Sequence, residues 1–230
     1  MSLILSVETA TNNCSVALHE NGTLIHLHEN NEPNSHGRLI VKMIESLFTN
    51  AGVKVKDLQA VAVSKGPGSY TGLRIGVSTA KGISFGLGIP IIAVDTLKAL
   101  AKQAVSESLS ENKLIVPMID ARRMEVYTAI YDHSLKIIQP LSPVIVEENI
   151  FEKYLENFEI TFLGDGMNKL KDILKHPNAI FLDCENSAKT IGELAFTKYA
   201  NGEFEDLAYF EPNYLKDFQV LKSKKNLLLQ

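Results

Sequence analysis

The chain is 230 residues long, which is enough for one large domain or two smaller ones. Its hydrophobic fraction of 45% and charged fraction of 22% are typical of a folded globular protein. The formal net charge is −4 and the isoelectric point is about 5.9, whereas a protein that grips nucleic acid alone usually carries a basic face. Composition therefore argues against autonomous nucleic-acid binding, and the basic run at residues 222–225 is interpreted as a solvated tail.

Cysteine content and hydropathy both favour the cytoplasm. Cys14 and Cys184 are too few for a disulfide framework, and the sequence contains no CxxC motif and no Cys/His zinc pattern. The first residues contain only a short apolar run and no basic segment, so no signal peptide is predicted. No apolar stretch approaches the roughly 20 residues that cross a bilayer. We therefore expect a cytoplasmic protein with no membrane contact.

The first half of the chain is predicted to begin with three strands joined by hairpins, over residues 3–7, 14–18 and 23–28. A helix over residues 36–51 follows, capped by Asn34 or Ser35 and ended by Gly52. A buried strand at 58–64 leads through a glycine-rich turn into a helix at 71–87. A strand at 89–94 and a helix at 96–107 complete the order βββαβαβα.

The second half is predicted to repeat this order, although no sequence identity links the two halves. The predicted elements are strands at 114–119, 124–131 and 137–146, a helix at 147–158, a strand at 160–163, a helix at 167–174, a strand at 179–182 and a helix at 187–200. Two such units in tandem resemble the actin-like (ribonuclease H-like) superfamily. The fold class is therefore α/β, with two mixed sheets flanked by helices.

We predict an N-terminal actin-like domain over residues 1–104, which carries the partner-binding helices, and a degenerate C-terminal domain over residues 105–230. The boundary is placed in the polar stretch 103–113. Periodicity does not decide whether the last segment, residues 207–230, stays with the second domain or packs back on the first.

The most distinctive motif is KGPGSYTGLR at residues 65–74, between a buried strand and a helix. Its glycines, Gly66, Gly68 and Gly72, suit close approach of backbone N–H groups to an anion. The spacing, however, matches neither a Walker A loop nor a dinucleotide fingerprint, and Pro67 removes one donor. Spacing alone favours a tight structural turn over a phosphate loop.

The helix after this loop carries a stripe of small residues. At about 100° per residue, Gly72, Gly76, Thr79, Ile83 and Gly86 fall on one narrow face. Glycine inside a helix costs up to about 1 kcal/mol relative to alanine, so the stripe implies close approach by another element. That element is either the protein's own sheet or a second subunit.

The preceding helix has a wide apolar surface, which spans roughly 200° where an amphipathic helix needs little more than about 100°. The excess predicts burial on two sides, by the core and by a neighbouring helix or subunit. The predicted partner surface comprises His36, Leu39, Ile40, Met43, Leu47, Gly72, Gly76, Thr79 and Ile83.

The turn between the first two strands is rich in small polar side chains. In actin-like ATPases this hairpin holds phosphate beside an acidic residue, whereas a plain Asx-rich turn is the alternative and is favoured without that fold. Asp120 and Arg122, at the end of a later strand, could meet a phosphate through arginine, or could form a structural ion pair. The predicted nucleotide-binding residues are Glu8, Thr9, Thr11, Asn12, Ser15, Asp120 and Arg122.

Searches for a metal or nucleophile motif are negative. His26 and His28 share one strand face, but no third ligand lies nearby in the sequence. Neither HExxH nor GxSxG occurs. We predict no catalytic residue and no metal site.

Several segments together resemble the TsaB (YeaZ) family, once filed with the M22 glycoproteases. They are ILSVETAT at 4–11 with CSVAL at 14–18, KGPGSYTGLRIG at 65–76 with AKG at 80–82, DARR at 120–123 with EVY at 125–127, and EPNYLK at 211–216. The match is close over residues 1–100, and local over 117–128 and 209–217. The glycine motif is the most specific of these segments.

The resemblance implies a non-catalytic scaffold required for threonylcarbamoyl transfer to adenosine 37 of tRNA. Such a scaffold pairs with a TsaD-like catalytic subunit through its first two helices, works with a TsaE-like ATPase, and meets tRNA only through the complex. A homodimer is expected when the chain is alone. No cofactor is firmly implied, although ATP or ADP with Mg at a subunit interface is one expectation.

The sequence departs from its relatives in informative places. The catalytic relative carries a His-x-x-x-His metal motif on its first helix, where this chain has His36 and Ile40, and isoleucine cannot ligate a metal. Glu8, Met124 and Lys216 replace a common aspartate, glycine and arginine. Two alternatives stay open: an actin-like ATP-dependent small-molecule kinase, for which neither a base nor a metal site is found, and an M22-type metallopeptidase, which the missing histidine disfavours.

Overall fold

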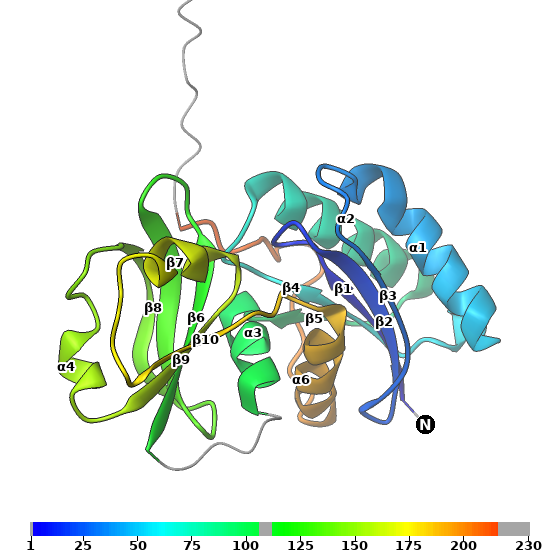
Figure 1. The fold of residues 1–230 in the computed structure, drawn as a ribbon. Helices are drawn as coiled ribbons and strands as arrows, with labels where there is room; N and C mark the ends of the chain where they lie inside the picture. Colours follow the sequence, from blue (N-terminus) through cyan, green and yellow to red (C-terminus); the bar gives the residue numbers. More distant parts are fainter. Residues whose placement is uncertain (1, 106–111, 216–230) are drawn as a thin grey trace, which may run out of the picture.

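The computed structural model describes residues 2–105 and 112–215, which form two α/β halves packed side by side (Figure 1). No helix in this part of the chain is long and apolar enough to cross a membrane. Each half contains one five-stranded mixed sheet.

The first sheet consists of β1 (Leu3–Glu8), β2 (Cys14–Glu20), β3 (Thr23–Asn30), β4 (Ala60–Ser64) and β5 (Ile91–Val94), in the order β3-β2-β1-β4-β5. The hairpin strands pair antiparallel, and β1, β4 and β5 pair parallel. The strands β1, β4 and β5 are buried along their whole length, as expected of strands covered on both faces. The predicted strands are confirmed to within two residues.

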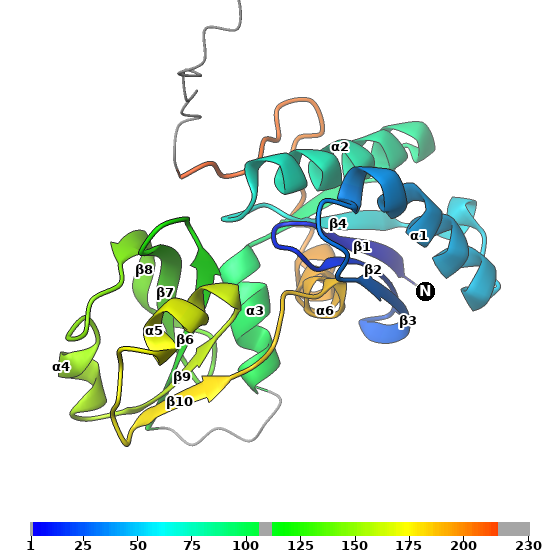
Figure 2. The same ribbon diagram turned by 45° about the horizontal axis from the view of Figure 1, so that its top comes forward.

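Two long helices, α1 (His36–Ala51) and α2 (Tyr70–Leu87), cover one face of this sheet (Figure 2). Buried side chains of α1, including Ile40, Met43 and Leu47, pack on apolar residues of β1, β2 and β4. As predicted, α1 ends at Gly52, whose φ of 67° is the left-handed conformation that glycine adopts without strain. A short 3-10 turn, η1 (Val55–Asp57), connects α1 to β4.

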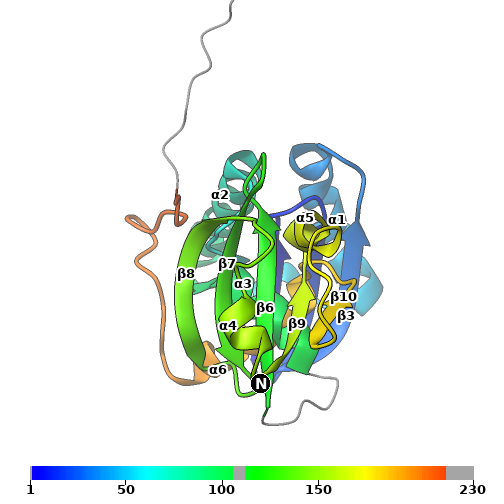
Figure 3. The same cartoon turned by 60° about the vertical axis from the view of Figure 1, so that its left-hand side comes forward.

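The second sheet repeats the first. Its strands are β6 (Lys113–Asp120), β7 (Glu125–Asp132), β8 (Ile137–Ile145), β9 (Glu159–Leu163) and β10 (Ala179–Leu182), in the order β10-β9-β6-β7-β8. β6 pairs antiparallel with β7 and parallel with β9, as β1 does with β2 and β4. Figure 3 shows this sheet from its own side of the molecule. The predicted duplication of a mixed α/β unit is confirmed.

Two predicted helices of the second half are much shorter than expected. The helix predicted at 147–158 is reduced to α4 (Glu152–Leu155), and that predicted at 167–174 to η2 (Asp165–Met167) and α5 (Asn168–Lys171). Residues 147–149 are all polar, so they offer this half's core nothing to bury. Single anchors such as Phe151 and Leu170 close the core instead. Both predictions were wrong in length. They followed the local apolar periodicity, whereas the length of a helix in a protein depends on how much apolar surface the fold lets it bury, which is little here.

The remaining two helices are exchanged between the halves. α3 (Thr96–Val105) follows the first sheet in sequence but packs Leu97 and Leu100 against the core of the second sheet. α6 (Ala188–Ala200) follows the second sheet but packs Ile191 and Ala195 on the first. Figure 2 shows α6 against the face of the first sheet opposite to α1 and α2. The domain division at residue 104 stays a prediction, and the last residues of the predicted helix 96–107 lie outside the described residues.

The described end of the chain returns to the first half. Glu205 forms a bridge with Ile91, and the Phe210 side chain is buried in the first core. The Asn213 N–H donates to the Lys65 carbonyl over 2.7 Å. Residues 205–215, which we call the strap, therefore run along α2 toward its first turn, while residues 216–230 lie outside the description.

Candidate functional site

The turn at residues 9–13, which we call the first turn, lies at the carboxyl end of β1, where the two long helices begin. The Ser69 N–H, at the start of α2, donates to the Ala10 carbonyl over 2.7 Å. Gly72 and Gly76 face the Thr9 backbone and side chain so closely that a Cβ at either position would collide with Thr9. Glycine is required here because α2 rests directly on the turn.

This contact explains the first part of the glycine stripe from within the chain. The close approach that the stripe implied is made by the protein's own first turn. Further along α2, Gly82 and Gly86 have nothing within 4 Å of a built Cβ. The outer glycines are therefore open, whereas Gly72 and Gly76 are internal packing positions.

Glu8 begins the first turn from a fully buried position. Its Oε1 accepts hydrogen bonds from the Ala10 N–H at 2.6 Å and from the Ser64 hydroxyl at 2.8 Å. Its Oε2 is buried without a hydrogen-bond partner among the described residues. Burial raises the pKa of this carboxyl to about 7, which outweighs the lowering effect of its hydrogen bonds.

His36, the first residue of α1, secures the other side of the turn. Its Nε2 lies 2.9 Å from the Thr11 carbonyl oxygen, and because a carbonyl only accepts, Nε2–H is the donor. The ring is largely buried. His36, which aligns with the first histidine of the His-x-x-x-His motif of the catalytic relative, is thus a structural hydrogen-bond donor in this chain.

The far side of the first turn is tied to the second half. Asn13 donates through Nδ2 to the Asn186 carbonyl at 2.9 Å. The Ser15 hydroxyl oxygen accepts from the Ala188 N–H, at the start of α6, over 2.8 Å. The Ser187 hydroxyl donates to Glu29 Oε1 over 2.6 Å. Ser15, predicted to hold phosphate, instead anchors the N-terminus of α6.

The turn between β6 and β7, at residues 121–124, contains a charged cluster. Asp120 pairs with Lys169 at 2.6 Å and also accepts the Arg122 backbone N–H at 2.6 Å. The Asp120 N–H donates to Asp165 over 2.9 Å, and burial raises the pKa of the Asp165 carboxyl. The structural ion pair expected of this segment exists, but its cation is Lys169 rather than Arg122. Nothing near Asp120 in the sequence indicates Lys169, because η2 and α5 bring it there.

The seven predicted nucleotide residues lie on two separate turns, one in each half of the chain. In the described chain, no hydrogen bond or ion pair joins Asp120 or Arg122 to the first turn. Glu8, Thr9 and Ser15 are fully buried, Thr11 is partly buried and only Asn12 is exposed. Like Asn12, Asp120 and Arg122 are exposed, whereas Thr9 Oγ1 and Thr11 Oγ1 are buried without a hydrogen-bond partner among the described residues, so nucleotide binding here stays a prediction. No group of three His, Cys, Asp or Glu side chains suited to a metal occurs in the described residues.

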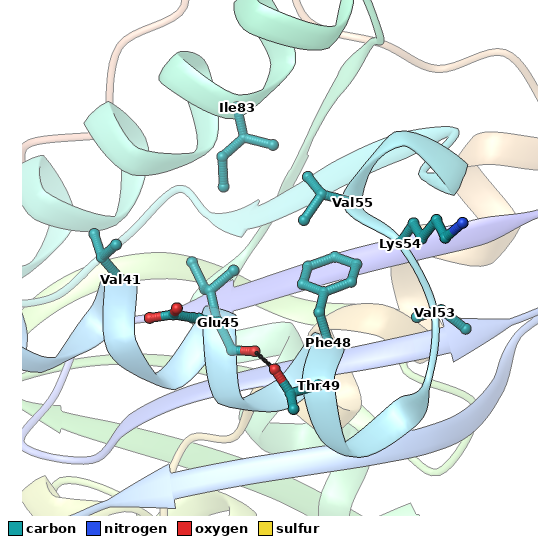
Figure 4. A pocket seen from close by; sticks show the side chains of 9 residues that line it. Val41, Glu45, Phe48, Thr49, Val53, Lys54, Val55 and Ile83 are labelled. Carbon is teal, nitrogen blue, oxygen red and sulfur yellow. Dashed lines mark hydrogen bonds between the residues drawn. The ribbon is translucent and has the colours of Figure 1, made fainter.

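A groove lies between the C-terminal half of α1, the η1 turn and α2 (Figure 4). Its volume is about 540 Å³. Most of the lining is apolar, and Val41 is 66% exposed. The lining residues are Val41, Ile44, Glu45, Phe48, Thr49, Val53, Lys54, Val55 and Ile83.

The predicted partner-surface residues divide into two groups in the structure. The buried ones, which point into the first half, are His36, Ile40, Met43, Leu47, Gly72 and Gly76. Leu39, Thr79 and Ile83 are partly exposed. Val41 belongs to the wide apolar surface predicted for α1 but was not among the predicted partner residues, and neither was Val55. The exposure of both depends on how α1 and η1 sit on the sheet. The two-sided burial of α1 stays a prediction, with the groove as its accessible side.

Comparison with known proteins identifies the family. Residues 32–223 match the family model described as TsaD, tRNA N6-adenosine threonylcarbamoyltransferase. The chain is 32% identical over 224 residues to the tRNA threonylcarbamoyladenosine biosynthesis protein TsaB of Escherichia coli K12, covering 93% of this chain and 94% of that protein. It is 30% identical to the Bacillus subtilis 168 protein of the same name, with 93% of each covered.

Solved structures agree with this result. YeaZ from Pseudomonas aeruginosa superposes with a TM-score of 0.80 at 28% identity, over 94% of this chain and 100% of that one. The ethanolamine utilization protein EutJ from Carboxydothermus hydrogenoformans is 9% identical with a TM-score of 0.54, which shows a shared fold alone. The chain belongs to the TsaB (YeaZ) family of tRNA threonylcarbamoyladenosine biosynthesis proteins.

Proposed function

We propose that this chain is a non-catalytic scaffold subunit for threonylcarbamoyl transfer to tRNA, and that it pairs with a TsaD-like catalytic subunit through the outer surface of α1 and α2. The relatives named TsaB support the pathway. The observation that carries the pairing is the apolar groove between these helices. A TsaE-like ATPase completes the proposed complex, which works in the cytoplasm, where tRNA is modified.

The groove has the chemistry of a protein-binding surface. Val41, Val55 and Ile83 line it with branched apolar side chains, and Glu45 and Lys54 add one charge of each sign. Covering apolar surface gains roughly 25 cal/mol per Å², so the apolar side chains of a partner helix would stabilise the pair. The open glycines Gly82 and Gly86 would let that helix approach α2 closely.

The first turn supports a scaffold role more than a kinase role. Glu8 and Ser15 make hydrogen bonds that hold the chain's own strands and helices together. A kinase of this fold needs such groups to face its nucleotide. The M22-type peptidase is disfavoured because His36 binds the Thr11 carbonyl and Ile40 is buried in the core.

A matched pair of substitutions tests the proposed interface. Val41→Asp places a carboxylate in the groove, and Ile145→Asp makes the same kind of change at a 62% exposed position on β8, in the other half. We expect the first variant to lose co-purification with the TsaD-like subunit of the same organism and to fail to support tRNA modification. The second should behave as the unmodified chain. Retention of the complex by Val41→Asp would show that pairing uses another surface.

The same surface gives the expected self-association when the chain is alone. We expect a homodimer by light scattering, which the TsaD-like subunit displaces. If the dimer persists unchanged in Val41→Asp, the two assemblies do not share this groove.

A further inference from the structure

The strap brings two sequence motifs together at the first turn of α2. Tyr214, from the motif at 211–216, packs against Tyr70, from the glycine motif, with ring centroids 4.7 Å apart and ring planes tilted by 43°. The Arg74 guanidinium lies 4.2 Å from the Tyr70 ring centroid, and its Nε–H donates to the Tyr214 hydroxyl over 3.3 Å. Neither the fold of the sheets nor the groove requires this cluster, which lies on the surface.

Most of the N–H donors of the Arg74 guanidinium have no hydrogen-bond partner among the described residues. Arg74 is exposed. Of its own guanidinium donors, only Nε–H has a hydrogen-bond partner in the described part of the chain. Glu211 lies close enough to attract Arg74 electrostatically, but the two do not form an ion pair. The other guanidinium donors can therefore reach an incoming anion.

Two further arginines are held at the tip of the β6–β7 hairpin. Arg122 and Arg123 have φ values of 70° and 51°, a left-handed conformation that non-glycine residues rarely adopt. Both are exposed, and within residues 2–105 and 112–215 neither guanidinium has an ion pair or hydrogen bond. Positive φ at two successive residues is the conformation that tight β-hairpin turns adopt, and here it places both arginines at the exposed tip of the hairpin.

The strap places these features at one end of the molecule. Leu215, next to Tyr214, packs against the second-half core cluster that includes Ala121 and Tyr127, at either side of the β6–β7 turn. Figures 1 and 2 draw the described end of the chain and this turn at the same end of the molecule, and Figure 3 draws the two apart. The described part of the chain ends here, at residue 215. We call the set Tyr70, Arg74, Arg122, Arg123 and Tyr214 the arginine–tyrosine surface.

We propose that the arginine–tyrosine surface contacts single-stranded RNA, as the part of the scaffold that meets tRNA within the complex. Arginine forks bind phosphates, and tyrosine rings and guanidinium planes stack on unpaired bases. An acidic protein segment would use the arginines but gain little from the two tyrosine rings. The inference rests on the proposed function, because the RNA contact requires that this chain is a subunit of a complex that modifies tRNA. A surface of this size adds to the affinity of a complex and does not make an acidic chain a strong RNA binder alone.

The test measures binding of a labelled RNA hairpin with an unpaired loop, by fluorescence anisotropy at several salt concentrations. The full chain is used alone and in complex with its TsaD-like subunit. Arg122→Glu/Arg123→Glu is compared with Lys136→Glu/Lys153→Glu, an equal change of charge at exposed lysines in the β7–β8 turn and on α4. Arg122→Gln/Arg123→Gln removes the charge without reversing it. Circular dichroism verifies folding of each variant.

We expect the arginine variants to weaken RNA binding at least tenfold, and the lysine control to change it less than twofold. For single strands, the slope of log affinity against log salt should fall by about 0.7 for each lost phosphate contact. Equal binding by wild type and both arginine variants overturns the proposal, as does an absence of RNA binding by the wild-type chain both alone and in the complex. Competition by polyglutamate as strong as by oligouridine would assign the surface to an acidic protein instead, and competition by ADP at low concentration would assign it to a small nucleotide.

Co-purification keeps this proposal distinct from the proposed function. If the arginine variants pair normally but bind RNA weakly, both proposals stand. If Val41→Asp pairs normally, the proposed interface fails, while RNA binding by Arg122→Glu/Arg123→Glu still decides the arginine–tyrosine surface by itself.

Discussion

The two halves share one strand order but differ in the helices that cover their sheets. The first half has α1 and α2, each at least 16 residues long, whereas the corresponding elements of the second half, α4 and α5, have 4 residues each. Long helices provide both an inner face for the core and an outer face for a partner. The apolar side chains of the short helices α4 and α5 pack into the core of their own half. The same topology therefore carries long helices with an exposed outer face in one half and short helices in the other.

The halves also differ in what their first hairpin turns do. The turn after β1 is enclosed by α1, α2 and the start of α6. Several of its polar groups bond within the chain, whereas Thr9 Oγ1, Thr11 Oγ1 and Asn13 Oδ1 are buried without a partner among the described residues. The turn after β6 is open, with Arg122 and Arg123 exposed. Equivalent positions of a duplicated fold thus serve opposite purposes, one as an internal joint and the other as an accessible surface.

The largest expected effect comes from breaking the internal joint. Gly76→Arg must displace Thr9 and should cost more than about 3 kcal/mol, the upper end of typical overpacking, so little folded protein is expected. Gly82→Arg, two turns further along the same helix, meets open space and should leave stability within about 1 kcal/mol of the wild type. Urea unfolding compares the two. Equal stability of both variants would show that α2 does not rest on the first turn.

The buried Glu8 predicts a pH-dependent difference. Its pKa is about 7 when folded and 4.5 in the reference state, so the native protein holds a proton that the unfolded chain releases between these values. Stability contributed by this group is present below pH 4.5 and is lost as pH rises toward 7. Glu8→Gln should remove this loss, which amounts to up to about 3 kcal/mol at pH 8. Parallel stability profiles for the two proteins from pH 5 to pH 8 would contradict the raised pKa.

His19 predicts the opposite slope. It is fully buried under α6, where Gly192 packs on its ring, and burial lowers its pKa from 6.5 to about 4. As the pH falls, the unfolded chain therefore binds a proton at His19 at a higher pH than the folded protein does. The free energy of unfolding that His19 contributes above pH 6.5 is lost as pH falls toward 4. The loss should reach about 2 kcal/mol between pH 6.5 and pH 5.

A His19→Gln variant tests this slope, since it keeps a polar side chain that does not titrate in this range. We expect its stability to depend less on acid than that of the wild type, by calorimetry or urea unfolding. An unchanged acid slope would mean that another group controls how α6 holds the first sheet.

The smallest effect is expected at the open turn of the second half. The Lys169–Asp120 pair is partly exposed, with the aspartate side chain 44% accessible, and such pairs contribute about 0–1 kcal/mol. Lys169→Met should therefore lower the free energy of unfolding by less than about 1 kcal/mol, measured in urea at low salt. A much larger loss would show that the turn after β6, like the turn after β1, is needed to hold its half of the fold together.

Much of the first half could be predicted from the sequence because its signals are local. Alternating and continuous apolar runs indicated the strands, and Gly52 indicated the end of α1. The short α4 and α5 were not predictable, because helical periodicity is a local signal whereas helix length depends on the apolar surface that the fold leaves to be covered.

The candidate sites follow the same division. The glycine motif and the segment at 211–216 could each be singled out in the sequence, but their contact through Tyr70 and Tyr214 spans more than a hundred residues. The same holds for Ser15 and Ala188, and for Asp120 and Lys169. No local pattern encodes such pairs, since each partner satisfies its own local rules.

By itself, the sequence determined the class of fold, its duplication and the family, because strand periodicity and the motif at 65–74 are properties of neighbouring residues. Only the tertiary structure decided which glycines of that motif are internal, which α1 residues are exposed, and that α3 and α6 cross between the halves. The physical reason is that burial is a property of the folded chain. A polar or small residue reveals whether it binds, packs or stays exposed only when the element that covers it is in place.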